Sequence, residues 1–234
     1  MSRPNITLYT TQTPNGIKIS IALEELGWFL KINPNGRIPA LTDTFSDGQT
    51  IRLFESGGIL QYLIDQYDPD HKISFPKGSR EYYEMNNWLF FQNAGVGPMQ
   101  GQANHFSRYA PERVEYGINR YVNETRRLYS VLDKHLAESK SGYLVGDHVS
   151  IADISHWGWV ASAGWAGVDI DEFVHLKAWE DRMAQRAGVE KGRHVPSPHT
   201  IKDLLKDKAT ADKLAAETRS WVQQGMKDDA KSKV

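Results

Sequence analysis

Two short polar stretches lie where helices are expected to begin, and both carry side chains that can bind anions. Thr13 and Asn15 belong to Thr-Pro-Asn-Gly, directly after a short β-branched segment, and Glu55 and Ser56 open a second helical pattern. The first turn of a helix leaves backbone N–H groups without intrahelical partners, so hydroxyl and amide groups there can help to hold a negative charge. Taken singly, Thr13 and Ser56 are equally typical of helix caps.

The chain contains no cysteine, which excludes disulfides, thiolate metal sites and a cysteine nucleophile. Any thiol chemistry therefore needs a thiol that a ligand brings. His105 and His156 stand alone among aromatic residues without a second ligand at metal-binding spacing, so we expect no metal. Lys and Arg (28) nearly balance Asp and Glu (29), a formal charge of −1 that offers no general attraction to nucleic acid or to a membrane.

The length of 234 residues and the hydrophobic content of 40% allow one large or two modest domains. No run approaches the ~18 apolar residues of a membrane span, and the first residues lack the apolar region of a signal peptide. We expect a cytoplasmic protein whose partners are small molecules or other proteins.

The elements that would position the polar stretches can be read from the apolar pattern. A β-branched strand over 5–10 leads into a helix with Thr13 as N-cap and Gly27 as its stop. Residues 38–42 and 50–54 flank an Asp-Gly turn, as in an antiparallel hairpin.

Beyond the hairpin, helical spacing dominates the chain. A helix begins at 55–57 and stops at 68–70, and residues 69–78 are turn-rich. A long helical period then runs over 114–136, and strand signals almost vanish.

Three further signals subdivide this helical part. Gly95, Gly97 and Pro98 predict a break or kink. Ser-Ile-Ala-Asp at 150–153 resembles an N-capping box, which makes Asp153 a structural residue in our interpretation. The residues from 202 to the end are charged and are expected to form a loose helical tail.

A β-α unit, a hairpin entered through Ile-Pro, a helix opening with Glu-Ser and a helical domain together resemble the glutathione transferase superfamily. The likeness spans residues 5 to about 185 and is closest to the fungal nitrogen-regulator-like and bacterial nu-class-like branch. It implies an α/β thioredoxin-like N-terminal domain over 4–68, a linker over 69–78, an all-α domain over 79–201 and a tail over 202–234. The motifs that carry it are 13–16, 33–40, 54–57, 95–99 and 146–153.

The resemblance also implies how glutathione would bind. The helix start at Ser56 would hold the γ-glutamyl carboxylate, and Glu55 would accept the α-amino group. With a cis Ile38–Pro39 bond, the backbone of Ile38 would pair with the cysteinyl unit, and Arg37 would meet the glycyl carboxylate.

The glutathione thiol would then lie at Thr13 and Asn15. Lowering a thiol pKa by two units needs about 2.7 kcal/mol. A helix dipole contributes ~0.3–1 kcal/mol, so a hydrogen-bond donor worth ~1.5–3 kcal/mol must supply most of it. The Asn15 amide is our first candidate and the Thr13 hydroxyl the second. Tyr9, near the end of the first strand, is the alternative activator.

The sequence identifies the binding site of the second substrate less clearly. Aromatic and basic side chains of the helical part are candidates, although aromatic residues at helical spacing are equally typical of a core. The candidates are His105, Phe106, Tyr109 and Arg127, together with Trp88 and Phe91.

Relative to the superfamily, the chain lacks a loop, an edge strand and the approach to a short helix between Gly27 and Trp28. The deficit is roughly 15 to 25 residues. We favour the explanation that the polypeptide contains residues that the printed sequence omits. A true deletion is the alternative, and it would alter the fold near Arg37.

The resemblance implies an enzyme that conjugates glutathione to electrophiles, as in detoxification, or that reduces disulfides with bound glutathione as the thiol. The alternative is a non-catalytic, glutathione-binding regulatory protein of the same fold. The expected partners are glutathione, a small electrophile or disulfide, and a second copy in a homodimer.

Overall fold

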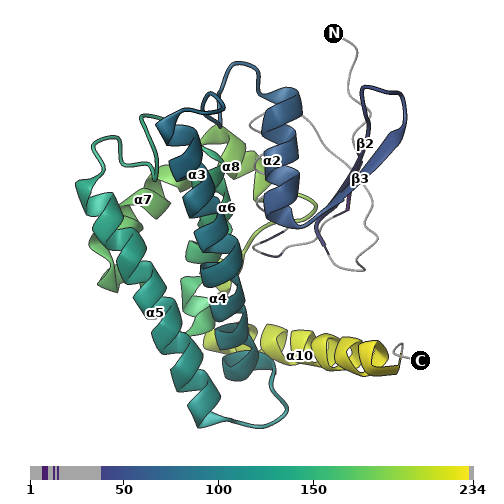
Figure 1. Cartoon of the computed structure of the whole chain (residues 1–234). Coiled ribbons are helices and arrows are strands. Elements are labelled where there is room, and N and C mark those ends of the chain that lie inside the picture. The colour runs from purple at the N-terminus through teal and green to yellow at the C-terminus, as the bar shows by residue number, and fades with distance from the viewer. Residues whose placement is uncertain (1–6, 10–12, 14, 16–37, 232–234) are drawn as a thin grey trace.

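A computed structural model describes residues 7–9, 13, 15 and 38–231 of the chain. It contains a small antiparallel sheet with one helix beside it, next to a bundle of helices (Figure 1). Three features predicted from the sequence lie largely outside the described residues: the helix from Thr13 to Gly27, the interruption after Gly27, and Arg37. Of the predicted helix, only Thr13 and Asn15 are described, and the backbone of Asn15 is helical.

The sheet joins β1 (Thr7–Tyr9), β2 (Ala40–Thr44) and β3 (Thr50–Phe54) in that spatial order. Ala40 is paired with Tyr9 on one side and with Phe54 on the other. The predicted hairpin is confirmed, and its turn contains Gly48 at a φ of 81°, which only glycine adopts without steric cost. The Ile38–Pro39 bond directly before β2 is cis, as the resemblance implied.

Helix α2 (Ser56–Tyr67) is tied to the sheet by its apolar face and by two phenols. Tyr62 and Tyr67 both donate hydrogen bonds to Oδ2 of Asp43, a buried residue of β2. Burial, and next the hydrogen bond to Asp43, raises the pKa of both phenols, so they remain donors at physiological pH. The buried apolar residues of the helix are Ile59, Leu60, Leu63 and Ile64.

The segment after α2 is folded against the start of the helical bundle. The buried Asp68 carboxylate accepts hydrogen bonds from the backbone of Lys72 (2.7 Å) and Ile73 (3.0 Å) and from the Ser74 hydroxyl (2.7 Å). The carbonyl of Ile73 in turn accepts the backbone N–H of Ile151 at 2.9 Å. This connection therefore fixes the first domain to the second.

Among the described residues, the regular elements beyond Phe54 are all helical. Two π-helical turns, Gln92–Val96 and His105–Tyr109, and two 3₁₀ turns, Ala163–Ala166 and Ile170–Glu172, interrupt the series. No described helix combines the length and apolar character that crossing a membrane requires. After α2 the helices are α3 (Arg80–Phe91), α4 (Gly97–Asn104), α5 (Glu115–Glu138), α6 (Ile151–Val160), α7 (Val174–Ala184), α8 (Ala187–Gly192), α9 (Ile201–Leu204) and α10 (Lys208–Lys231).

At the predicted break or kink near Gly95 and Gly97, the helix widens into a π turn. The backbone stays helical through the π turn between α3 and α4, and Pro98 lies in the first turn of α4. Helix α5 matches its predicted period and buries Thr125, Leu128, Leu132 and Leu136.

Helix α6 is buried along its whole length, and its start has the predicted capping box. The fully buried Asp153 carboxylate accepts hydrogen bonds from the backbone of Ser150 (3.0 Å) and Leu144 (2.9 Å) and from the Trp179 indole (2.9 Å). Burial raises the pKa of Asp153 even though these bonds oppose the shift. Its structural interpretation is therefore confirmed.

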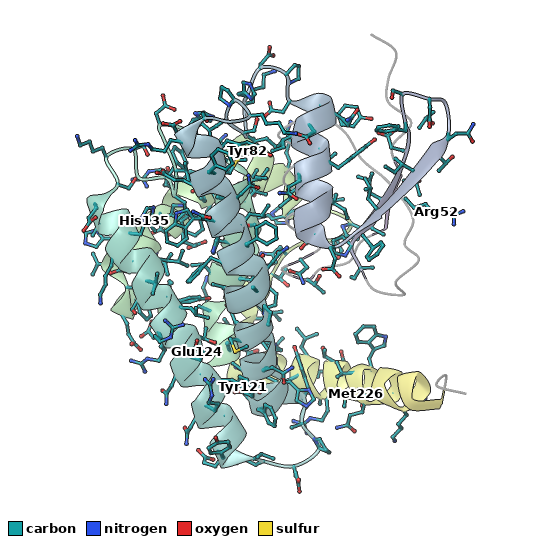
Figure 2. All side chains as sticks on the ribbon, in the orientation of Figure 1. Arg52, Tyr82, Tyr121, Glu124, His135 and Met226 are labelled. Carbon is teal, nitrogen blue, oxygen red and sulfur yellow. The ribbon has the colours of Figure 1, made fainter. Side chains whose placement is uncertain are left out.

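The C-terminal segment is helical, and its first half is packed instead of loose. Ala211 and Ala215 of α10 are buried against Trp165, and Arg219 donates two hydrogen bonds to the carbonyl of Arg108. The second half extends from the bundle on the side of the sheet (Figure 1), and Figure 2 shows Met226 on this projecting part.

Candidate functional site

The start of α2 has an unusual backbone conformation. Glu55 is exposed and has a φ of 64° and a ψ of 116°, while its carbonyl accepts the N–H of Ile59 at 2.9 Å. A positive φ in a residue other than glycine costs about 1–3 kcal/mol. Ser56 is the first residue of the helix and is only 6% exposed. Glu55, and not Ser56, is therefore the N-cap, which corrects the capping interpretation of Ser56.

A side chain of the helical domain reaches the same helix start. A Cβ atom added to Gly57 would lie 2.2 Å from Nδ2 of Asn93, in the π turn after α3. Only glycine therefore lets the Asn93 amide approach the first turn of α2 this closely. Asn93 was absent from our sequence-based candidates, because no local signal relates it to α2.

The other predicted polar stretch also contacts the helical domain. The indole Nε1–H of Trp159, on α6, donates a hydrogen bond of 3.0 Å to Oδ1 of Asn15. Trp159 is 7% exposed, and Asn15 is half-buried. Trp159 was likewise missed from the sequence, because it is separated from Asn15 by 144 positions.

A cavity of about 620 Å³ opens beside Thr13. Among the described residues, Thr13 lines it from the first domain, and the other lining residues belong to the helical domain and the C-terminal segment. Its lining residues are Thr13, Asn104, Tyr109, Ser162, Trp165, Ser197, Pro198, His199, Thr200, Ile201, Leu204, Thr210, Lys213, Leu214, Glu217 and Thr218.

Tyr109 is one of the residues that line this cavity. Trp165 donates its indole N–H to the Tyr109 oxygen at 2.6 Å, and the Arg108 guanidinium lies 4.5 Å from the centre of the Trp165 ring. Burial raises the pKa of Tyr109, although Trp165 and Arg108 act against it. The phenol is therefore protonated at neutral pH, and because it accepts from Trp165 its own proton is left to donate elsewhere.

The other predicted second-substrate residues do not line the cavity. Phe106 stacks on Tyr121 with ring centres 5.5 Å apart, and His105 packs edge-on against Phe106. Arg127 forms hydrogen bonds with Glu124 on the exposed side of α5. Figure 2 shows Glu124 on that helix, on the side of the bundle away from the sheet.

Trp88 and Phe91 belong to the aromatic core between α3, α5 and α6. Their rings lie 5.3 Å apart, and Trp88 also packs on His135 at 4.4 Å. Phe91 stacks on His156, which is fully buried and bonded through Nδ1 to the carbonyl of Ala152. Within the described residues, no group of His, Asp and Glu side chains is arranged to hold a metal ion.

Comparison with known proteins identifies the family. Residues 95–187 match the model of the glutathione S-transferase C-terminal domain. A glutathione S-transferase-like protein, tpcF of Aspergillus fumigatus, is 38% identical over 222 residues, which cover 83% of this chain and 97% of that protein. The disulfide-bond oxidoreductase YfcG of Escherichia coli is 39% identical over 201 residues, which cover 77% of this chain and 91% of that protein.

Solved structures agree with these relatives. A glutathione transferase homologue from Lodderomyces elongisporus, with two glutathione molecules per subunit, superimposes with a TM-score of 0.78 at 42% identity. The match covers 82% of this chain and 98% of that one. The sheet with its cis proline, the helical bundle and these relatives lead to one conclusion: the chain belongs to the glutathione S-transferase family.

Proposed function

We propose that this protein is a glutathione-dependent enzyme that conjugates glutathione to a small electrophile, reduces a disulfide with bound glutathione, or does both. The observation that carries the proposal is the cavity at Thr13. It places a polar helix start of the first domain beside a partly aromatic space of about 620 Å³, which is within the usual range for small-molecule sites.

The α2 start is the proposed anchor for the γ-glutamyl end of glutathione. A carboxylate there would meet the first-turn N–H groups and the Ser56 hydroxyl, and the exposed Glu55 carboxylate would pair with the ammonium group. Ile38, directly before β2, would pair its backbone with the cysteinyl unit. Arg37 remains our prediction for the glycyl carboxylate.

The thiol would be activated by Asn15 and Thr13. An amide N–H bonded to a thiolate is a charge-assisted hydrogen bond, worth about 1.5–3 kcal/mol. A stabilisation of that size lowers the thiol pKa by about one to two units, because one unit corresponds to 1.36 kcal/mol. The Thr13 hydroxyl, at the edge of the cavity, is the proposed second donor.

The acceptor would occupy the cavity beyond the thiol. Trp165, Ile201 and Leu214 offer apolar surface there, while Tyr109 offers a hydroxyl donor. This lining suits a small apolar or aromatic acceptor with one polar group. Disulfide reduction is supported by the similarity to YfcG, which is named a disulfide-bond oxidoreductase. His105, Phe106 and Arg127 have no role in this proposal, since they lie away from the cavity.

We further propose a homodimer in the cytoplasm. Phe54 on β3 and Tyr83 and Phe90 on α3 are large apolar side chains that are 49 to 61% exposed, as expected of a surface that a second copy covers. Sedimentation at micromolar concentration tests the assembly, and a monomer there would contradict it.

The function itself is tested by calorimetric titration with glutathione, followed by two assays side by side. One assay uses a chloronitrobenzene electrophile and the other a small mixed disulfide. Binding with turnover in either assay supports an enzyme and identifies the reaction. Binding without turnover in both would favour the alternative, a glutathione-binding regulatory protein, and absence of binding would reject both.

A further inference from the structure

We infer that Trp159 is a positioning residue for thiol activation: its indole N–H holds the Asn15 amide so that the –NH₂ group is presented to the glutathione sulfur. The inference rests on the proposed function, in which Asn15 is the donor to the thiol. It adds a residue of the helical domain to the activation of the thiol, which the proposed function otherwise assigns to Asn15 and Thr13 of the first domain.

The chemistry of the pair fixes the orientation of the amide. An amide side chain has a donor end and an acceptor end, and it can present either one to a neighbour. The indole Nε1–H can only donate, so the atom that it meets at 3.0 Å must be Oδ1 of Asn15. The Nδ2 group then points away from Trp159. A flipped amide would direct its carbonyl oxygen at the thiolate, and the partial negative charge of that oxygen would be repelled by the charged sulfur.

Trp159 is itself held by a buried hydrogen-bond network. Its carbonyl accepts a bond from Gln100 Nε2 at 2.8 Å, and Gln100 Oε1 accepts the Tyr129 hydroxyl at 2.6 Å. Gln100 and Tyr129 are both 0% exposed. Burial raises the pKa of Tyr129, so its hydroxyl remains a donor over the working pH range. Polar groups are costly to bury, and this network secures the backbone of Trp159 from α4 and α5.

Two glycines of α4 provide the surface on which the indole ring rests. A Cβ atom at Gly97 would lie 3.4 Å from Cζ2 of Trp159, and one at Gly101 would lie 3.7 Å from its Cη2. At Gly97 the added Cβ would come closer still to the Gln92 side chain, at 2.8 Å, so the tighter restriction there comes from Gln92. The two glycines, one helical turn apart, therefore let the indole ring lie close to the α4 backbone.

These contacts form a continuous connection from α5 through α4 and α6 to the first domain. The acidity of the bound thiol therefore depends on the helical domain, although the thiol ligand is bound at the other one. Because the indole bond is between neutral groups, it is worth less than the amide-to-thiolate bond that it orients.

The direct test is the variant Trp159→Phe, which keeps an aromatic ring on α6 beside α4 but removes the N–H. The readout is the pKa of glutathione bound to the protein, titrated through the ultraviolet absorbance of the thiolate. We expect a rise of about half to one unit, smaller than the rise in Asn15→Ala. Trp159→benzothienylalanine, which replaces only the N–H by sulfur, should give the same rise in a ring of nearly unchanged shape.

Two controls separate positioning from a general loss of packing. Trp157→Phe removes an indole N–H from the same helix, where it donates to the carbonyl of Glu180 at 3.3 Å, and it should leave the thiol pKa unchanged. In the double variant with Asn15→Ala, the Trp159 substitution should add no further rise, because it acts only through that amide.

A parental thiol pKa in both Trp159 variants overturns the inference, as does an equal rise in Trp157→Phe or an additive rise in the double variant. These results leave the proposed function standing, provided that the parent protein binds glutathione with a lowered thiol pKa. If the parent does not bind glutathione, the proposed function fails, and the role of Trp159 falls with it.

Discussion

Replacing Asn15 by alanine tests whether an amide activates the thiol. The substitution removes the donor to sulfur while leaving the helix start, the Thr13 hydroxyl and the cavity in place. A lost charge-assisted hydrogen bond of about 1.5–3 kcal/mol raises the thiol pKa by about one to two units. Below both pKa values, the thiolate fraction is then about ten to a hundred times lower than in the parent.

The rate falls by less than the thiolate fraction. A more basic thiolate is a better nucleophile, with a Brønsted coefficient of about 0.4–0.5, so roughly half of the logarithmic loss is recovered in each attack. We therefore expect kcat/KM near neutral pH to fall about three- to fifteenfold. The deficit should shrink as pH rises and reverse above the thiol pKa of the variant, since both thiols are then fully ionised and the more basic thiolate of the variant is the better nucleophile.

Stability should change little in this variant. The Asn15 side chain also accepts the Trp159 indole N–H, and a neutral hydrogen bond between partly buried groups is worth about 0.5–1.5 kcal/mol. Urea denaturation measures this term separately from the pH profile of kcat/KM. Tyr9→Phe is the matched comparison and should keep rate and thiol pKa within a few-fold of the parent. The amide assignment is refuted if Tyr9→Phe abolishes turnover while Asn15→Ala keeps both the parental pKa and the parental rate.

Three further predictions concern other parts of the molecule. Ser56→Ala and Glu55→Ala should each raise the Kd for glutathione about ten- to a hundredfold in calorimetry, because each leaves a charged group of the ligand without its partner; parental affinity in both would remove the anchor. Asp153→Ala should lower the free energy of unfolding, measured by urea titration, by about 3 kcal/mol or more, because it leaves buried donors unpaired. Asp203 forms an exposed pair with Lys206, so Asp203→Ala should change the same free energy by less than about 0.5 kcal/mol. The interruption after Gly27 is tested by the mass of the intact purified polypeptide, measured by mass spectrometry. A mass above 26.5 kDa is expected if the polypeptide has additional residues there, and a mass of 26.5 kDa would establish a true deletion.

Local patterns predicted several elements because the interactions that form them are themselves local. The hairpin follows from β-branched residues on both sides of an Asp-Gly turn, and α5 follows from an apolar period that buries Leu128 and Leu132. The capping box joins Ser150 to Asp153, only three positions further along the chain, so its residue types suffice to recognise it. At Gly95, Gly97 and Pro98, where a break or kink was predicted, the structure has a π turn between α3 and α4.

Which residues meet in the candidate site is determined by contacts between segments that are far apart in the sequence. By itself, the sequence determined that a thiol must come from a ligand, that two helix starts carry anion-binding groups, and which family pattern they follow. Only the tertiary structure decided that Trp159 meets Asn15, that Asn93 reaches the start of α2, and that Tyr109 faces the cavity while Arg127 does not. Helical periodicity indicates only that a side chain faces the interior of the protein. Which partner that side chain contacts depends on how α4, α5 and α6 pack against the first domain.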